Sequence, residues 1–204
     1  MLLYHYAAKG NTVERDGLLS FARNPNADLS YYFKRSGKTT HADIVSWFES
    51  KFDGRSRGIR AFPSRIQPTE KSKSLQNFIE NADLFAIDID ALDAAGRLES
   101  VYVSPSVMDT PDISESADAD EMLYKLSDTR LIDASPVDWS VCDDSLGRRF
   151  AYVRYYLLIV KDGIIPPRFI KKLPAATLTT CFPPPQRYFG TARKHFALDI
   201  MSPI

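Results

Sequence analysis

Leu2-Leu3-Tyr4-His5-Tyr6-Ala7 opens the chain as a short apolar and aromatic run that holds a single histidine. This composition predicts a buried strand with one polar group inside it. Asn11 follows six residues after His5, and Asp16-Gly17-Leu18-Leu19 comes next. We therefore expect a first strand, then a short helix or turn over residues 11–16 that ends at Gly17, with the later elements arranged around the first strand.

This order of strand, histidine, asparagine and Gly-Leu resembles the first motif of the ADP-ribosyltransferase superfamily, which includes the poly(ADP-ribose) polymerases. The resemblance is good up to Leu19 and loose beyond it, and Tyr6 stands where the family usually has glycine. It implies an α+β fold with a split, mixed or antiparallel sheet and short helices, and NAD as the substrate. It also implies that His5 hydrogen-bonds the adenosine-side ribose of NAD, with Asn11 in the same NAD-binding motif.

An aromatic strand that stacks on nicotinamide is the second feature that the resemblance implies. Two segments compete for this role, Ser30-Tyr31-Tyr32-Phe33 and Ala61-Phe62-Pro63-Ser64. A ring face offers a flat apolar platform to a charged aromatic ring, so Tyr31, Tyr32 and Ser64 join the expected NAD-binding residues. Ordinary packing of these aromatics in the core is the structural alternative.

Three arginines cluster in Gly54-Arg55-Ser56-Arg57-Gly58-Ile59-Arg60. Guanidinium groups bind phosphate oxygens through two parallel hydrogen bonds, and glycines let a ligand approach the backbone. Arg57 or Arg60 is therefore a candidate for binding the pyrophosphate of NAD. A nucleic-acid backbone is a second candidate anion, and a solvated turn between a helix and a strand is the structural alternative.

The third feature that the resemblance implies is a glutamate at the start of a late strand, and Glu99 in Leu98-Glu99-Ser100-Val101-Tyr102-Val103 fits it. A fixed negative charge would stabilise the oxocarbenium-like ribose as nicotinamide leaves. The family often has an acidic residue or glutamine two positions earlier, where this chain has Arg97. Asp138 and Asp143 are later candidates for the acid, and a surface residue at a strand edge is the structural alternative for Glu99.

Helical and strand patterns alternate irregularly along the chain, which favours an α+β domain over a doubly wound sheet. Besides the first strand, strands are expected at residues 58–62, 84–89 and 98–103. Helices are expected at 41–51 behind the cap Thr40, at 71–81, at 90–95 before Gly96, at 120–126 and at 166–172, and a helix followed by a strand within 150–160. Residues 104–120 are expected to form an acidic surface loop. We expect one domain over 1–173 and a Pro- and aromatic-rich tail over 174–204.

The composition limits the possible partners and cofactors. Lys+Arg and Asp+Glu both number 26 in 204 residues, so the chain as a whole is not biased toward polyanions. The cysteines, Cys142 and Cys181, and the three histidines lie far apart, which argues against a structural metal or a disulfide scaffold and favours a reducing compartment. No apolar stretch approaches the ~20 residues of a spanning helix and no signal peptide is recognisable, so we expect a cytoplasmic protein, or one delivered into a host cytoplasm.

Two classes of function remain open. The first is an ADP-ribosyltransferase-like enzyme, a toxin, effector or defence component that cleaves NAD and modifies a protein or nucleic acid. The second is a non-enzymatic protein-binding or inhibitor module that uses the acidic loop 104–120 and the C-terminal tail. An RNA-directed activity through Arg55, Arg57 and Arg60 is a weaker third interpretation, and it predicts a steep salt dependence of RNA binding.

Overall fold

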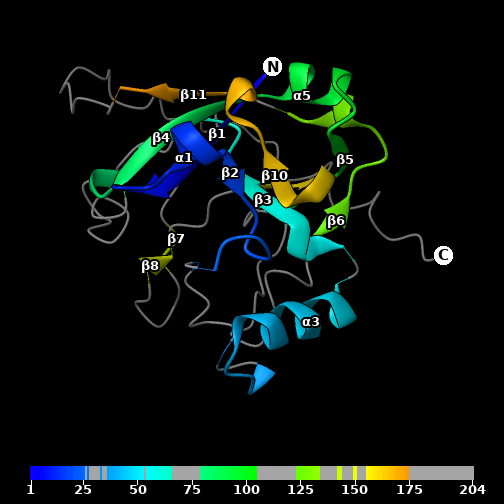
Figure 1. Cartoon of the computed structure of the whole chain (residues 1–204). Coiled ribbons are helices and arrows are strands. Elements are labelled where there is room, and N and C mark those ends of the chain that lie inside the picture. The colour runs from blue at the N-terminus through cyan, green and yellow to red at the C-terminus, as the bar shows by residue number, and fades with distance from the viewer. Residues whose placement is uncertain are drawn as a thin grey trace.

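The computed structural model describes residues 1–25, 27, 33, 36–52, 54–65, 79–104, 123–133, 142–143, 149–150 and 155–174. Over these residues the chain is mixed α+β with antiparallel sheets (Figure 1). The strands are β1 (Leu2–Ala8), β2 (Leu18–Leu19), β3 (Gly58–Ala61), β4 (Ala82–Asp88), β5 (Leu98–Val103), β6 (Tyr124–Lys125), β7 (Cys142–Asp143), β8 (Arg149–Phe150), β9 (Tyr156–Val160), β10 (Ile164–Ile165) and β11 (Ile170–Leu173). The α-helices are α1 (Val13–Asp16), α3 (His41–Lys51) and α5 (Ile89–Ala94), and the short 3-10 turns are η1 (Arg55–Arg57), η3 (Thr129–Leu131), η4 (Lys161–Gly163) and η5 (Pro167–Phe169).

The first strand pairs with a strand from the middle of the chain. Sheet β1-β4-β11 is antiparallel throughout, with Leu3 opposite Ile87 and His5 opposite Phe85. Opposite residues of antiparallel strands share a face, and Leu3, Phe85 and Ile87 are fully buried. The His5 side chain therefore starts from the core face of this sheet.

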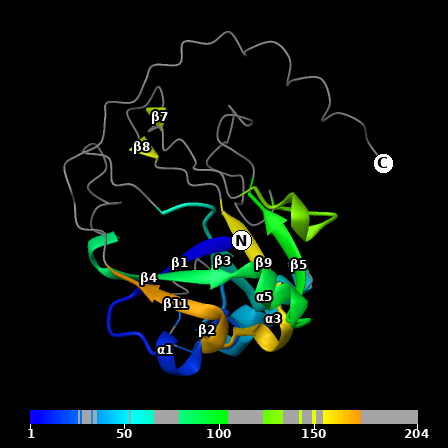
Figure 2. The same ribbon diagram turned by 90° about the horizontal axis from the view of Figure 1, so that it is seen from above.

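A second antiparallel sheet has the order β3-β9-β5-β6. Its central strand β9 is buried at all five residues, because one face packs in the main core and the other carries a smaller apolar cluster. Figure 2 shows β3, β9 and β5 next to the β1-β4-β11 sheet when the molecule is seen from above.

The two sheets meet at one bridge between β1 and the end of β3. Tyr4 and Phe62 exchange both backbone hydrogen bonds, with N···O distances of 2.9 and 2.7 Å. This bridge is isolated, so β1 and β3 meet without forming a continuous ladder. The strands therefore run in the order β11-β4-β1, then a split, then β3-β9-β5-β6. We call this junction the seam.

Helix α3 belongs to a separate small cluster. Thr40 caps it as expected, since its hydroxyl oxygen accepts from the Asp43 backbone N–H at 3.2 Å. Ile44, Phe48 and Phe52 are buried together, apart from the main core, and Phe21 packs edge-on against Phe48. Figure 1 accordingly shows α3 set apart from the sheets.

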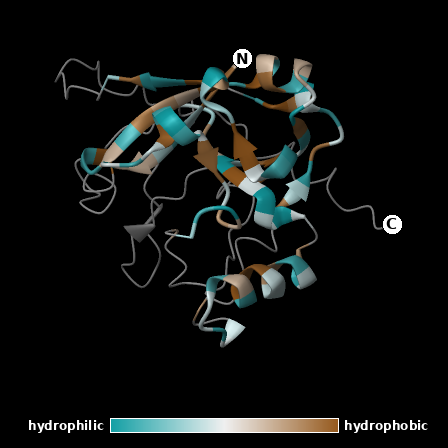
Figure 3. Cartoon of the chain, viewed as in Figure 1, coloured by the Kyte–Doolittle hydropathy of each residue, from teal (hydrophilic) through white to brown (hydrophobic). Residues whose placement is uncertain are grey.

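The short strands β2 and β10 pair close to the main core, and Figure 3 colours both as hydrophobic. Gly17 turns the chain into β2 with φ +84°, and a side chain there would place its Cβ 2.3 Å from the Ile165 carbonyl oxygen. Glycine is required at this position, because both the backbone angle and the contact exclude other residues. The reversal expected at Gly17 is present.

The predictions of two helices are wrong in part. Tyr124–Lys125, within the expected helix 120–126, form β6 against the edge of β5. In the expected helix 166–172, only η5 is helical, and Ile170–Leu173 pair with β4 as β11. In both cases an available strand edge outweighs a weak local helical pattern. The expected strands 58–62, 84–89 and 98–103 and the helix 41–51 are confirmed within one or two residues.

Several expectations lie outside the described residues. These include Tyr31, Tyr32, most of the helix 71–81, the acidic loop after Ser104, Asp138, the helical part of residues 150–160 at 151–154, and the tail beyond Pro174. None of the helices in the described part of the chain is long and apolar enough to cross a membrane.

Candidate functional site

His5 is half-buried at the seam and bonds across it. Its Nδ1 lies 2.7 Å from the Arg60 carbonyl oxygen. In an antiparallel ladder the carbonyls of every second residue point to the same neighbour, so Arg60, like Phe62, presents its carbonyl to β1. The imidazole therefore adds a contact between side chain and backbone next to the backbone hydrogen bonds of Tyr4 and Phe62.

This contact determines the tautomer of His5. A carbonyl oxygen only accepts, so Nδ1 carries the proton, and in a neutral ring Nε2 is then an acceptor. Burial lowers the pKa of His5 below its ordinary value of 6.5, and the hydrogen bond to the Arg60 carbonyl opposes this only in part. The ring is thus neutral at pH 7, in a form that accepts a hydrogen bond from a hydroxyl group.

Asn11 has a local structural role in this arrangement. Its Nδ2 donates to the Ala8 carbonyl at 2.8 Å and to Asp83 Oδ2 at 2.9 Å. Its Oδ1 accepts from the Val13 backbone N–H at 3.0 Å and so stabilises the start of α1. Asn11 therefore ties the end of β1 to β4 through contacts within the chain.

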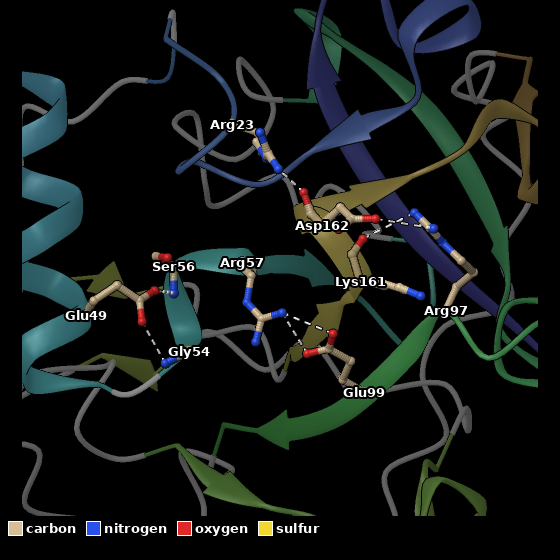
Figure 4. Close-up of polar contacts among 9 residues, drawn as sticks. All are labelled: Arg23, Glu49, Gly54, Ser56, Arg57, Arg97, Glu99, Lys161 and Asp162. Carbon is tan, nitrogen blue, oxygen red and sulfur yellow. Dashed lines mark hydrogen bonds and ion pairs between the residues drawn. The ribbon is translucent and has the colours of Figure 1, made fainter.

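Arg57 and Glu99 come together although 42 residues separate them in the sequence. The Nη1 of Arg57 lies 3.0 Å from Oε1 and 2.8 Å from Oε2 of Glu99, and Figure 4 shows the two side chains facing each other. Glu99 lies at an irregularity in the pairing of β5 with β9, between Leu98 and Ser100. The candidate acid and a candidate pyrophosphate ligand thus form one ion pair, with side chains 42% and 37% exposed.

The other two arginines of the basic cluster lie against aromatic rings. The guanidinium carbon of Arg55 is 4.5 Å from the centroid of Tyr102 and 5.6 Å from that of Phe52. The guanidinium carbon of Arg60 is 5.0 Å from the centroid of Tyr155. These are cation–π distances. Arg55 and Arg60 therefore lie over rings on the same side of the β3-β9-β5 sheet.

Glu49 is a structural residue that sequence reasoning missed. Its carboxylate, at the end of α3, accepts from the backbone N–H of Gly54 at 2.7 Å and of Ser56 at 3.0 Å (Figure 4). These amides are the ones that a glycine-containing loop would offer to a phosphate. An internal carboxylate therefore occupies the anion-binding backbone of the loop, and no pattern in the sequence linked the helix to it.

Arg97, two residues before Glu99, binds the neighbouring turn η4. Its Nη2 donates to the Lys161 carbonyl at 3.2 Å, and its Nη1 lies 3.5 Å from Asp162 Oδ2. Arg23 donates to the Asp162 carbonyl at 2.9 Å on the other side of the turn. Asp162 has φ +61°, so these two arginines hold an unusual backbone conformation beside the Arg57–Glu99 pair.

Of the other expected NAD-binding residues, the structure describes only some. Ser64 is half-buried just beyond the seam, and Tyr31 and Tyr32 lie outside the described residues. A pocket of about 340 Å³ opens at the ends of β4 and β11, lined by Lys9, Ala82, Asp83, Leu84, Lys172, Leu173 and Pro174. The described structure therefore brings His5 to the Arg60 strand and Glu99 to Arg57, while this pocket lies at neither position.

Comparison of the chain with protein-family models, with curated proteins and with solved structures found no match.

Proposed function

We propose that the protein cleaves NAD and transfers ADP-ribose to a macromolecular acceptor in a cytoplasm, as a toxin, effector or defence component with an ADP-ribosyltransferase-like fold. The observation that carries the proposal is the position of His5. It lies on the first strand, at the split between two antiparallel sheets, and its tautomer is set by the Arg60 carbonyl. A neutral imidazole of this kind suits a ribose hydroxyl.

In the proposed reaction His5 Nε2 accepts a hydrogen bond from the adenosine-side ribose. The bond between the nicotinamide nitrogen and the ribose breaks, and its electron pair leaves with nicotinamide. The negative charge of Glu99 stabilises the positive charge that develops on the ribose. The acceptor then forms the new bond and releases a proton, while Tyr31 or Tyr32 would stack on the nicotinamide.

Arg57 has two possible partners in this scheme. In the described structure it pairs with Glu99, and with NAD bound it would contact the pyrophosphate. An exposed ion pair of this kind is worth only about 0–1 kcal/mol, so a dianionic pyrophosphate competes for the guanidinium at little cost. Binding of NAD would then release the carboxylate toward the ribose.

The test is the release of nicotinamide from NAD by the purified protein, with and without nucleic acid and cell lysate. His5→Asn is the sharpest variant, because the asparagine amide still donates to the Arg60 carbonyl but lacks Nε2. His5→Asn and Glu99→Gln, made separately, should each lower turnover by about a hundredfold or more. This is the usual cost of removing a group that stabilises transition-state charge. Glu80→Gln, on the exposed surface, is the matched control and should retain full turnover.

Equal turnover in wild type, His5→Asn and Glu99→Gln would contradict the assignment. The second candidate is a non-enzymatic binding module, and the mutual neutralisation of Arg57 and Glu99 favours it. It predicts no nicotinamide release by the wild type and no change in its unfolding temperature with NAD or ADP-ribose, whereas a specific ligand at a hundred times its Kd adds about 2.7 kcal/mol of stability.

A further inference from the structure

The outer face of the β3-β9-β5-β6 sheet carries a row of side chains that runs across all four strands. Arg60 lies opposite Leu157, Leu157 opposite Tyr102, and Tyr102 opposite Lys125. Directly opposite residues of antiparallel strands point to the same side, so these four side chains form one transverse row. With strands about 4.8 Å apart, the row is about 14 Å long and has a cation at each end.

Aromatic rings and a further cation flank this row. Phe62 lies two residues after Arg60, and Tyr155 lies two residues before Leu157, so both point to the same side as this row. Both belong to the apolar cluster that also contains Tyr102. Arg60 lies over the ring of Tyr155 and Arg55 over the ring of Tyr102. Two cations of this face therefore lie over ring faces.

The exposure of these side chains distinguishes the face from a core surface. Arg60 and Lys125 are exposed, and Tyr102 and Phe62 are half-buried. The four positions of the row include no acidic residue, so its net charge is positive although the whole chain is neutral. Exposed cations beside partly exposed rings match a flexible polyanion that carries its own flat rings.

We propose that this face, formed by Arg55, Arg60, Phe62, Tyr102 and Lys125, binds single-stranded nucleic acid. Phosphates contact Arg60 and Lys125, which are far enough apart for two separate groups. Unpaired bases stack on Phe62 and on the guanidinium of Arg55, which lies over the ring of Tyr102. A duplex hides its base faces, so it cannot use the rings. Binding at this face does not depend on NAD cleavage, although Arg60 also holds His5 through its carbonyl. Where the proposed function holds, binding at this face makes nucleic acid the acceptor.

The test is fluorescence anisotropy of labelled oligothymidylate and oligouridylate with the full chain, without NAD, over a range of salt concentrations. Arg60→Gln and Lys125→Gln should each weaken binding about tenfold and reduce the slope of log affinity against log salt by about 0.7, the value for one phosphate of a single strand. Tyr102→Leu keeps an apolar side chain in the cluster and should weaken binding about five- to a hundredfold at an unchanged slope. Lys171→Gln, an exposed lysine on β11, is the control and should bind like the wild type.

Circular dichroism and thermal unfolding establish that each variant is folded before its affinity is interpreted. The proposal is overturned if Arg60→Gln, Lys125→Gln and Tyr102→Leu all bind as the wild type does. Binding of duplex as tightly as single strands, or binding of polyglutamate in place of oligonucleotide, overturns it equally. Since binding is measured without NAD, its failure is distinguishable from an absence of nicotinamide release.

Discussion

The two faces of the β3-β9-β5 sheet differ sharply although they are built from alternate residues of the same strands. On the inner face Ile59, Leu158 and Val101 are opposite one another and at most 2% exposed. On the outer face Arg60, Leu157 and Tyr102 occupy the same three strands one residue along. One face thus packs in the main core, while the other carries a smaller apolar cluster with cations and rings at its margin.

If the outer face binds nucleic acid as proposed, this difference would let stability and recognition be altered at separate residues. Successive side chains of a strand point to opposite faces, so a substitution on one face leaves the other nearly unchanged. The comparison predicts that changes on the inner face act on the free energy of unfolding, whereas changes of the exposed or half-buried outer side chains Arg60, Tyr102 and Lys125 act mainly on the proposed binding.

The largest effect is expected for Leu158→Ala. The side chain is fully buried in the main core, so its truncation should cost about 2–5 kcal/mol through lost burial and a residual cavity. Leu157→Ala, its immediate neighbour on the outer face, should cost less than half of that, because its cluster is small and bordered by exposed side chains. Urea unfolding of both variants measures this, and equal losses would contradict the difference between the faces.

Gly58→Ala tests how tightly the outer face is packed at its start. A Cβ there would lie 2.6 Å from Leu157 Cδ1 and 2.8 Å from the Arg55 carbonyl oxygen, so we expect a loss of about 1–3 kcal/mol from overpacking. Combination with Leu157→Ala removes the side-chain clash. The double variant should then be more stable than the sum of the single effects, and strict additivity would show that the backbone contact dominates.

His5 predicts how stability at the seam depends on pH. Because its pKa is lowered in the folded state, the unfolded chain binds a proton more readily than the folded protein below the ordinary value of 6.5. The contribution of His5 is therefore complete above pH 6.5 and is lost as the pH falls below it. Chemical unfolding of wild type and His5→Asn between pH 7.5 and about pH 5 should show a smaller decrease for the variant, and parallel curves would exclude this role.

The smallest effect on stability is expected for the Arg57–Glu99 pair. Both side chains are partly exposed, so a double-mutant cycle with Arg57→Gln and Glu99→Gln should give a coupling energy of about 1 kcal/mol or less. A coupling several times larger would mean that the pair is a structural element of the sheet, and it would weaken the idea that NAD separates the two side chains.

The sequence predicts the local elements of this fold well, for reasons that specific residues make plain. Thr40 and Asp43 define the start of α3, and Gly17 and Gly96 end the short helices through positive φ angles. The pairing of β1 with β4 and the seam at Phe62 depend on contacts more than fifty residues apart, which no local pattern encodes. The sequence does not predict β6 and β11, because both are strands only through pairing with segments that are not their neighbours in the chain.

The candidate site was predictable as a set of residues but not as an arrangement. His5 stands out as a histidine in an apolar run, and Glu99 as an acid at a strand start. That Arg57 would pair with Glu99, and that Asn11 would tie the end of β1 to Asp83 on β4, follows from three-dimensional proximity alone. The row Arg60, Leu157, Tyr102 and Lys125 likewise exists only through the register of four strands.

The Glu49 carboxylate gives α3 a role that its separate cluster does not suggest. It holds the Gly54 and Ser56 amides, and so it connects the helix directly to the loop that carries Arg57. Any displacement of α3 would move this loop relative to Glu99, which is fixed on β5. A displacement of this peripheral helix would thus be transmitted to the ion pair of the proposed site.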